Sequence, residues 1–285
     1  MSQNRTIREN TSPGKLNSFL QTYVVGFICG NAALFVGHPA ERLKVAAQVK
    51  LNMSTLQVVK PLITNLELLY TGFVSCIYRQ NIKLVYRSAI MSQIPHRIDD
   101  LNLSPALASA LKASFASSID TAFVTPPENV KTWQMRDTTK NVSVCDAISG
   151  IYQTRGFKGF LFGVTPTMTK SFPAWFYLFL GYHATKEKRQ KENFFATIFW
   201  ATCASIPVTV MTNPIDVIKT NMQATKNIKS LSMLEMSKNI YQQHGLFAFG
   251  RGLPFRLIHK ALATSTAYFI MDADSQLRKG SQRNK

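Results

Sequence analysis

The sequence predicts an all-α membrane bundle in which six long helices surround a central cavity. Three observations predict this fold: a hexapeptide that recurs three times, small residues that keep the same phase, and six segments long enough to cross about 30 Å of hydrocarbon. Of the 285 residues, 46% are apolar and 17% are charged. This balance excludes disordered, collagen-like and disulfide-stapled chains.

The hexapeptide consists of a proline, an acid two residues later and a base three residues after the acid. Pro39–Lys44 recurs as Pro126–Lys131 and as Pro214–Lys219, at intervals of 87 and 88 residues. Small residues stand thirteen and nine positions before each proline: Gly26 and Gly30, Ala113 and Ser117, Ala201 and Ser205. Such spacing lets helix backbones approach closely in a bilayer. The small residues therefore support the same repeat as the hexapeptide does.

Each repeat is expected to form a long helix through the proline motif, a short amphipathic stretch and a second long helix. In chain order the long helices are expected at 16–48, 73–95, 104–134, 164–190, 194–224 and 253–279. The repeats themselves span about 16–97, 104–190 and 194–279. They form one domain over 1–285, with a polar N-terminal tail at 1–15 and a basic C-terminal tail at 280–285.

The hydropathy of the chain conflicts with a simple membrane bundle. Mean hydropathy is close to zero, and Arg79, Lys83 and Arg87 form a basic stripe on one face of the second helix. A water-filled cavity resolves the conflict, because each helix then needs only one lipid-facing side. Cations inside a spanning helix must line water or meet an anion.

Residues 16–279 resemble the mitochondrial carrier family, through the triplicated Pro-x-acid-x-x-base motif and the length of the repeats. The resemblance implies six transmembrane helices with threefold pseudosymmetry and three short matrix helices. It also implies a multi-pass protein of the mitochondrial inner membrane that works by alternating access around one solute site. Lys and Arg are spread almost evenly over the two implied sides, so the positive-inside rule does not set the orientation.

The prolines Pro39, Pro126 and Pro214 are expected to bend their helices inward, because proline lacks an N–H donor and clashes with the preceding turn. Glu41 and Lys44 share a helical face and could pair within one helix. The resemblance implies instead that the acid of one repeat pairs with the base of the next. The resulting matrix gate consists of Glu41 with Lys131, Glu128 with Lys219, and Asp216 with Lys44, with Gln48 and Gln223 as bracing glutamines. Exposed pairs contribute only about 0–1 kcal/mol each, which suits a gate that opens.

The resemblance also implies substrate contacts on the even helices, seven residues after a glycine. The contacts at and next to that position are Arg79 with Gln80, Lys170 with Ser171, and His259 with Lys260. The basic stripe adds Lys83 and Arg87 to the expected contacts. Asp120 lies in a spanning segment, where it either faces the cavity or serves capping and packing. The histidines show no metal-binding spacing, and no metal or cofactor is expected.

At the opposite mouth the sequence departs from the family. The positions that normally carry gate charges read Met91-Ser92, Tyr182-His183 and Met271-Asp272, so no complete ion pair is expected there. A gate on the matrix side alone predicts a protein that rests open toward the outside.

The function expected is transport of an anionic metabolite, because the contact residues carry about five positive charges without an acid among them. Exchange (antiport) and one-way transport both stay open. A nucleotide such as ATP or ADP, or another phosphorylated compound, is favoured, and a di- or tricarboxylate is the alternative. The second contact, Lys170-Ser171, argues against a nucleotide. Less favoured alternatives are a soluble basic protein that binds nucleic acid and a carrier-like scaffold without transport. No enzyme motif is found. The expected partners are a small anion and membrane lipids, including acidic phospholipids such as cardiolipin; we expect a monomer and no nucleic acid.

Overall fold

The computed structural model describes residues 13–99, 103–185, 194–225, 232–263 and 265–266, and these are helices joined by short turns. The long helices are α2 (Pro13–Val49), α5 (Phe73–Asp99), α6 (Pro105–Met135), α8 (Val164–Thr185) and α9 (Phe194–Ala224). The short elements are α3 (Thr55–Ile63), α4 (Leu66–Leu69), α7 (Val144–Arg155), η1 (Phe157–Leu161), α10 (Met233–His244) and η2 (Leu246–Gly250). A last helical segment covers 253–263 and 265–266.

The helix positions agree with the sequence, although the ends differ. The first helix begins at Pro13 rather than at 16, and α5 continues to Asp99, beyond the expected end at 95. Residues 186–190 of the fourth expected helix and 267–279 of the sixth lie outside the described residues. The three prolines of the motif lie inside continuous α2, α6 and α9. The inward bend at these prolines stays a prediction.

A serine begins the short helix of each repeat. The hydroxyl groups of Ser54, Ser143 and Ser232 accept hydrogen bonds from backbone N–H groups in the first turns of α3, α7 and α10. This cap satisfies a donor that the helix itself cannot pair. In α3 and α10 a Gln or Glu at the third position closes a full capping box. The sequence therefore starts all three short helices by the same local mechanism.

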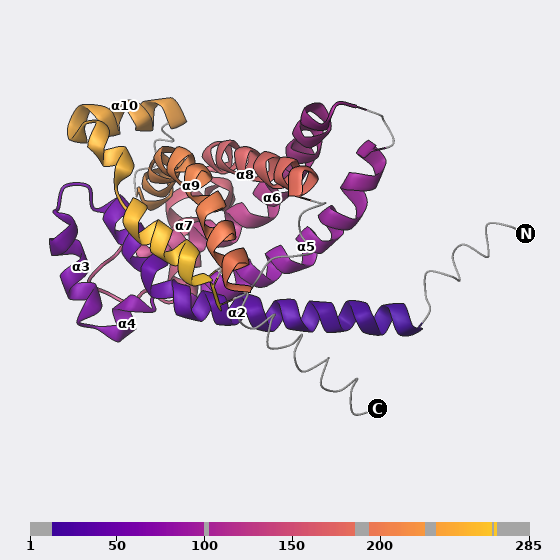
Figure 1. Cartoon of the computed structure of the whole chain (residues 1–285). Coiled ribbons are helices and arrows are strands. Elements are labelled where there is room, and N and C mark those ends of the chain that lie inside the picture. Colours follow the sequence, from indigo (N-terminus) through magenta and orange to yellow (C-terminus); the bar gives the residue numbers. More distant parts are fainter. Residues whose placement is uncertain (1–12, 100–102, 186–193, 226–231, 264, 267–285) are drawn as a thin grey trace, which may run out of the picture.

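The long helices pack side by side around a common centre. In chain order α5 packs against α2 and α6, and α8 packs against α6 and α9, while contacts between α2 and α9 link the first and third repeats. Figure 1 shows α3, α4 and α10 at one end of the molecule. The proline motifs of α2, α6 and α9 thereby come together although they are far apart in the sequence.

Apolar side chains cover much of the outside of the bundle. Phe27 and Phe35 on α2, Phe115 and Phe123 on α6, and Met211 on α9 are all exposed. The acids and bases of the proline motifs are buried instead, apart from Lys44, which is half-buried. This distribution reverses that of a water-soluble protein, in which charged side chains are mostly exposed. Among the described residues, no helix combines the length and the apolarity that crossing a membrane requires.

Candidate functional site

A cavity of about 580 Å³ lies between the helices and contains most of the expected contact residues. Seven of them line it: Arg79, Gln80, Lys83, Lys170, Ser171, His259 and Lys260. The side chain of Arg87 lies outside the described residues. Asp120, whose orientation the sequence left open, also lines the cavity. The expected contact residues include no acid, but the odd helices contribute Glu41, Asp120 and Glu128 to the same wall.

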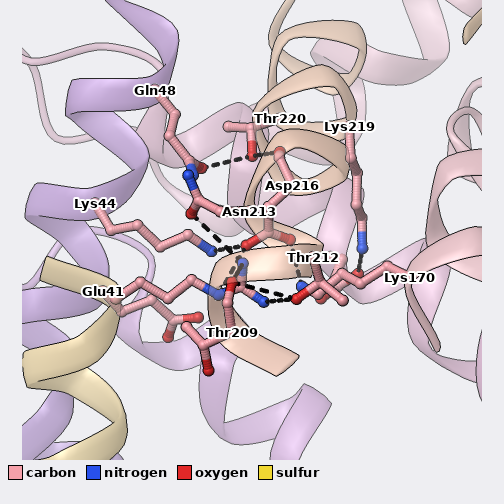
Figure 2. Close-up of polar contacts among 12 residues, drawn as sticks. Glu41, Lys44, Gln48, Lys170, Thr209, Thr212, Asn213, Asp216, Lys219 and Thr220 are labelled. Atoms are coloured by element: carbon pink, nitrogen blue, oxygen red, sulfur yellow. Dashed lines mark hydrogen bonds and ion pairs between the residues drawn. The ribbon is translucent and has the colours of Figure 1, made fainter. Parts of the chain in front are cut away.

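Three ion pairs join the repeats at the proline motifs, and we call them the ion-pair ring. The pairs are Glu41 with Lys131, Glu128 with Lys219, and Asp216 with Lys44, the last at 2.5 Å. Figure 2 shows the side chain of Lys44 on α2 extending to Asp216 on α9. The geometry is the one that the resemblance implies, with each acid bound to the base of another repeat.

Burial makes these pairs more costly to break than exposed pairs would be. The exposed fractions of Glu41 and Lys131 are both 5%, and that of Asp216 is 2%. The value for exposed pairs therefore does not apply, since removing one partner of a buried pair leaves an uncompensated charge and costs about 3–5 kcal/mol. Opening the ring must transfer these charges to water or to another partner.

Further cations from the even helices bind the carboxylates of the ring. Arg79 lies 3.0 Å from Glu41 and 3.2 Å from Glu128, and so bridges two repeats. Lys170 and Arg256 both contact Asp216, the latter at 3.5 Å. Figure 2 shows Lys44 and Lys170 converging on this one carboxylate. Two of the cations assigned to a solute thus already have anionic partners.

The expected bracing glutamines bind threonines of neighbouring helices. Gln48 accepts a hydrogen bond from Thr220 at 3.0 Å (Figure 2), and Gln223 accepts one from Thr132 at 3.1 Å. Each of these bonds joins two odd helices of different repeats. The glutamines therefore connect the odd helices next to the ring.

The glycine that precedes each even helix packs against the same position of another repeat. The three contacts are Gly72 with Met135, Gly163 with Gln223, and Gly252 with Gln48. All three glycines have a positive φ, which side-chain-bearing residues rarely adopt. Met135 thus takes the structural place of the missing third glutamine.

Three arginines that the sequence analysis missed bind the carboxyl ends of the odd helices of other repeats. Arg42 donates to the carbonyls of Met135 and Asp137, Arg155 to those of Met222 and Thr225, and Arg251 to those of Lys50, Leu51 and Met53. A cation is favourable there because the last carbonyls of a helix lack partners and carry partial negative charge. Burial lowers the pKa of Arg155, since desolvation disfavours the charged form. These arginines occupy unrelated positions in their repeats, so repeat analysis had no signal for them.

Among the described residues, His38, Glu41 and Cys76 form a buried group with ligand atoms within 4.8 Å of one another. These residue types can bind zinc. However, Glu41 already contacts Arg79 and Lys131, so a metal ion would have to displace both cations. Sequence spacing did not reveal this group because it forms only where α5 packs against α2.

The opposite mouth cannot be compared with its expected gate. The side chains of Ser92, His183 and Asp272 lie outside the described residues.

A family model described as mitochondrial carrier protein matches residues 102–193 and 190–278. The chain is 24% identical over 281 residues to a mitochondrial glycine transporter of Xenopus tropicalis, covering 90% of each chain. A mitochondrial glycine transporter of Yarrowia lipolytica is 25% identical, with coverage of 87% of this chain and 91% of the relative. A glutamate/glycine mitochondrial carrier of Schizosaccharomyces pombe is 26% identical, with coverage of 92% and 96%.

The matches to the second and third repeats confirm the six-helix carrier fold expected from the sequence. Because the family model covers more than half of the chain, this protein belongs to the mitochondrial carrier family and is a transporter of the mitochondrial inner membrane, not an enzyme.

Proposed function

We propose that the protein moves a small carboxylate-bearing metabolite through the central cavity by alternating access. The position of Arg79 carries this proposal, because its guanidinium bridges Glu41 and Glu128 while lining the cavity. A carboxylate on the solute offers Arg79 the same bidentate acceptor that the two glutamates offer now. Solute binding then draws Arg79 away from the ring and weakens the closure.

Lys170 supports the same coupling in another repeat. Its ammonium contacts Asp216 and its side chain is 27% exposed to the cavity side of the bundle, against 3% for the aspartate. A solute can therefore reach Lys170 more easily than it can reach the carboxylate beneath. Asp216 would keep Lys44 and Arg256 when Lys170 turns to the solute.

The ring acts as the matrix gate in this proposal, with Gln48 and Gln223 linking the odd helices beside it. Three tandem repeats over the single domain then form one alternating-access unit. Because all three described pairs are closed around an accessible cavity, the state described corresponds to one open toward the outside. The absence of expected gate charges at the opposite mouth favours this resting state.

The ion pairs weaken the argument for a nucleotide. From the sequence, a nucleotide is favoured because Arg79 and Lys170 count as cations without an acidic partner. In the structure both contact carboxylates of the ring. Relatives named as glycine and glutamate/glycine carriers make a small amino acid the first solute to test. A nucleotide remains the second candidate, because the described residues of the cavity wall include seven Lys and Arg side chains and three carboxylates.

Uptake by purified protein in liposomes tests the proposal. The solutes are radiolabelled glycine, glutamate, malate, citrate, ADP and ATP, each measured with empty liposomes and with liposomes preloaded with unlabelled solute. We expect uptake of a carboxylate solute with six or fewer carbons. The Arg79→Gln variant should reduce this uptake at least about tenfold. The exposed Lys140→Gln variant serves as the control. Uptake of ADP or ATP alone would contradict the proposal, and a requirement for preloading would identify antiport.

A further inference from the structure

One wall of the cavity contains a carboxylate held in place by two hydroxyl groups. Asp120 of α6 is 4% exposed and lines the cavity. Tyr86 of α5 donates its hydroxyl to one carboxylate oxygen, and Ser171 of α8 donates to the other at 3.1 Å. Three helices thus orient a single acid whose charge the membrane-spanning position makes costly to keep.

Aromatic rings border this carboxylate. Trp175, one turn after Ser171 on α8, lines the same cavity and packs in one cluster with Tyr86, Ala113 and Val124. A carboxylate and aromatic rings on one cavity wall can together bind an ammonium group, through a charge-assisted hydrogen bond to the carboxylate and cation–π attraction to a ring. It is unsuited to a phosphate or a second carboxylate, which the negative charge repels.

The opposite charge lies next to it along α8. Lys170 and Ser171 are adjacent in sequence, so their side chains leave the helix in directions about 100° apart around its axis. Lys170 therefore contacts Asp216, while Ser171 contacts Asp120. The same cavity wall offers a cationic side for a carboxylate and an anionic side for an ammonium group.

We propose that Asp120 binds the ammonium group of the transported solute, which makes the substrate class a zwitterionic amino acid. This inference rests on the proposed function, in which Arg79 and Lys170 receive the solute carboxylate. Asp120 then determines specificity, because a solute without an ammonium group cannot form the charge-assisted hydrogen bond with this carboxylate. Such a loss discriminates more strongly than a change in size does.

Matched solutes isolate this role. The probes are glycine and glutamate, each compared with the hydroxy acid in which a hydroxyl replaces the amino group, glycolate and 2-hydroxyglutarate. Binding is measured by calorimetry on the purified full chain in detergent. We expect at least one amino acid to bind the parent about tenfold more tightly than its hydroxy acid, a ratio that equals about 1.4 kcal/mol. In the Asp120→Asn variant this ratio should fall to about one, mainly through weaker binding of the amino acid.

The control is Asp146→Asn, the same chemical change at an exposed aspartate in the first turn of α7; it should keep the tenfold ratio. A purely structural Asp120 would weaken both members of a pair equally and leave the ratio unchanged in Asp120→Asn, which overturns the inference. If Asp120→Asn does not fold, equal affinities of the parent for both members of each pair overturn it as well. In either case binding of carboxylates by the parent leaves the proposed function standing. If neither these probes nor malate or citrate bind the parent, the proposed function fails too.

Discussion

Charge reversal in the ion-pair ring tests whether Arg79 stabilises the ring through its charge. Combining Glu41→Lys with Lys131→Glu restores one pair with reversed polarity. However, Arg79, which lies 3.0 Å from Glu41 in the parent, then faces an ammonium group at position 41. We therefore expect Arg79→Gln to destabilise the parent and to stabilise the reversed variant.

The contacts of Arg79 set the size of the effect. In the parent, Arg79→Gln removes the contacts of 3.0 Å and 3.2 Å with Glu41 and Glu128. Hydrogen bonds to charged groups contribute about 1.5–3 kcal/mol each, so the loss of both contacts costs about 3–6 kcal/mol, while each glutamate keeps its lysine. In the reversed variant, Arg79→Gln relieves a repulsion of about 4 kcal/mol for like charges 4 Å apart at an effective dielectric constant of 20. It still loses the bond to Glu128, so a gain of about 1–2 kcal/mol remains.

Thermal unfolding in one detergent measures this sign reversal on the parent, Arg79→Gln, the reversed variant and their combination. For a chain of this size 1 kcal/mol shifts Tm by about 2 °C. Tm should thus fall by about 6–12 °C in the parent background and rise by about 3 °C in the reversed one. Lys140→Gln, at an exposed loop position, should change neither background. An equal fall of Tm in both backgrounds would show that Arg79 acts through packing, and the electrostatic reasoning would be refuted.

Two further predictions concern how the repeats are joined. Arg155→Met should lower the free energy of unfolding by about 3 kcal/mol, because the carbonyls of Met222 and Thr225 lose a charged donor. Denaturant unfolding measures this loss, with Lys158→Met at an exposed position as the control. Equal losses of stability in the two variants would contradict the prediction. Gly72→Ala should cost more than Gly156→Ala. Both residues have positive φ, which costs alanine about 1–3 kcal/mol, but only at Gly72 would the added Cβ meet Met135, at 3.2 Å. Tm values of the two variants that agree within error would argue against that packing contact.

The amino-acid sequence is sufficient to predict the repeat and the features that follow from its phase. Local signals suffice for the helices, since the serine caps and the glycines with positive φ act within a few residues. The phase of the proline motif, together with the family resemblance, was enough to name the partners in the ion-pair ring. Spacing along one helix sets which side chains share a face, and threefold repetition places equivalent faces opposite one another.

The other side-chain contacts at those helix faces depend on tertiary packing and could not be predicted from the repeat. The phase of the repeat could not show that Arg79 bridges two glutamates, that Lys170 and Arg256 share Asp216, or that Asp120 lines the cavity. Arg79 and Lys170 occupy the same position of their repeats and contact the acid of the next repeat, Glu128 and Asp216. Arg256 and Asp120, in contrast, stand where the other two repeats carry uncharged residues, so their contacts lack counterparts in those repeats. They arise because each helix pair packs at its own depth and rotation, and that packing depends on side chains throughout the bundle. The charge of the cavity, and with it the substrate class, therefore follows from how acids and bases meet in space, and counting them along the chain overstated the excess of cations.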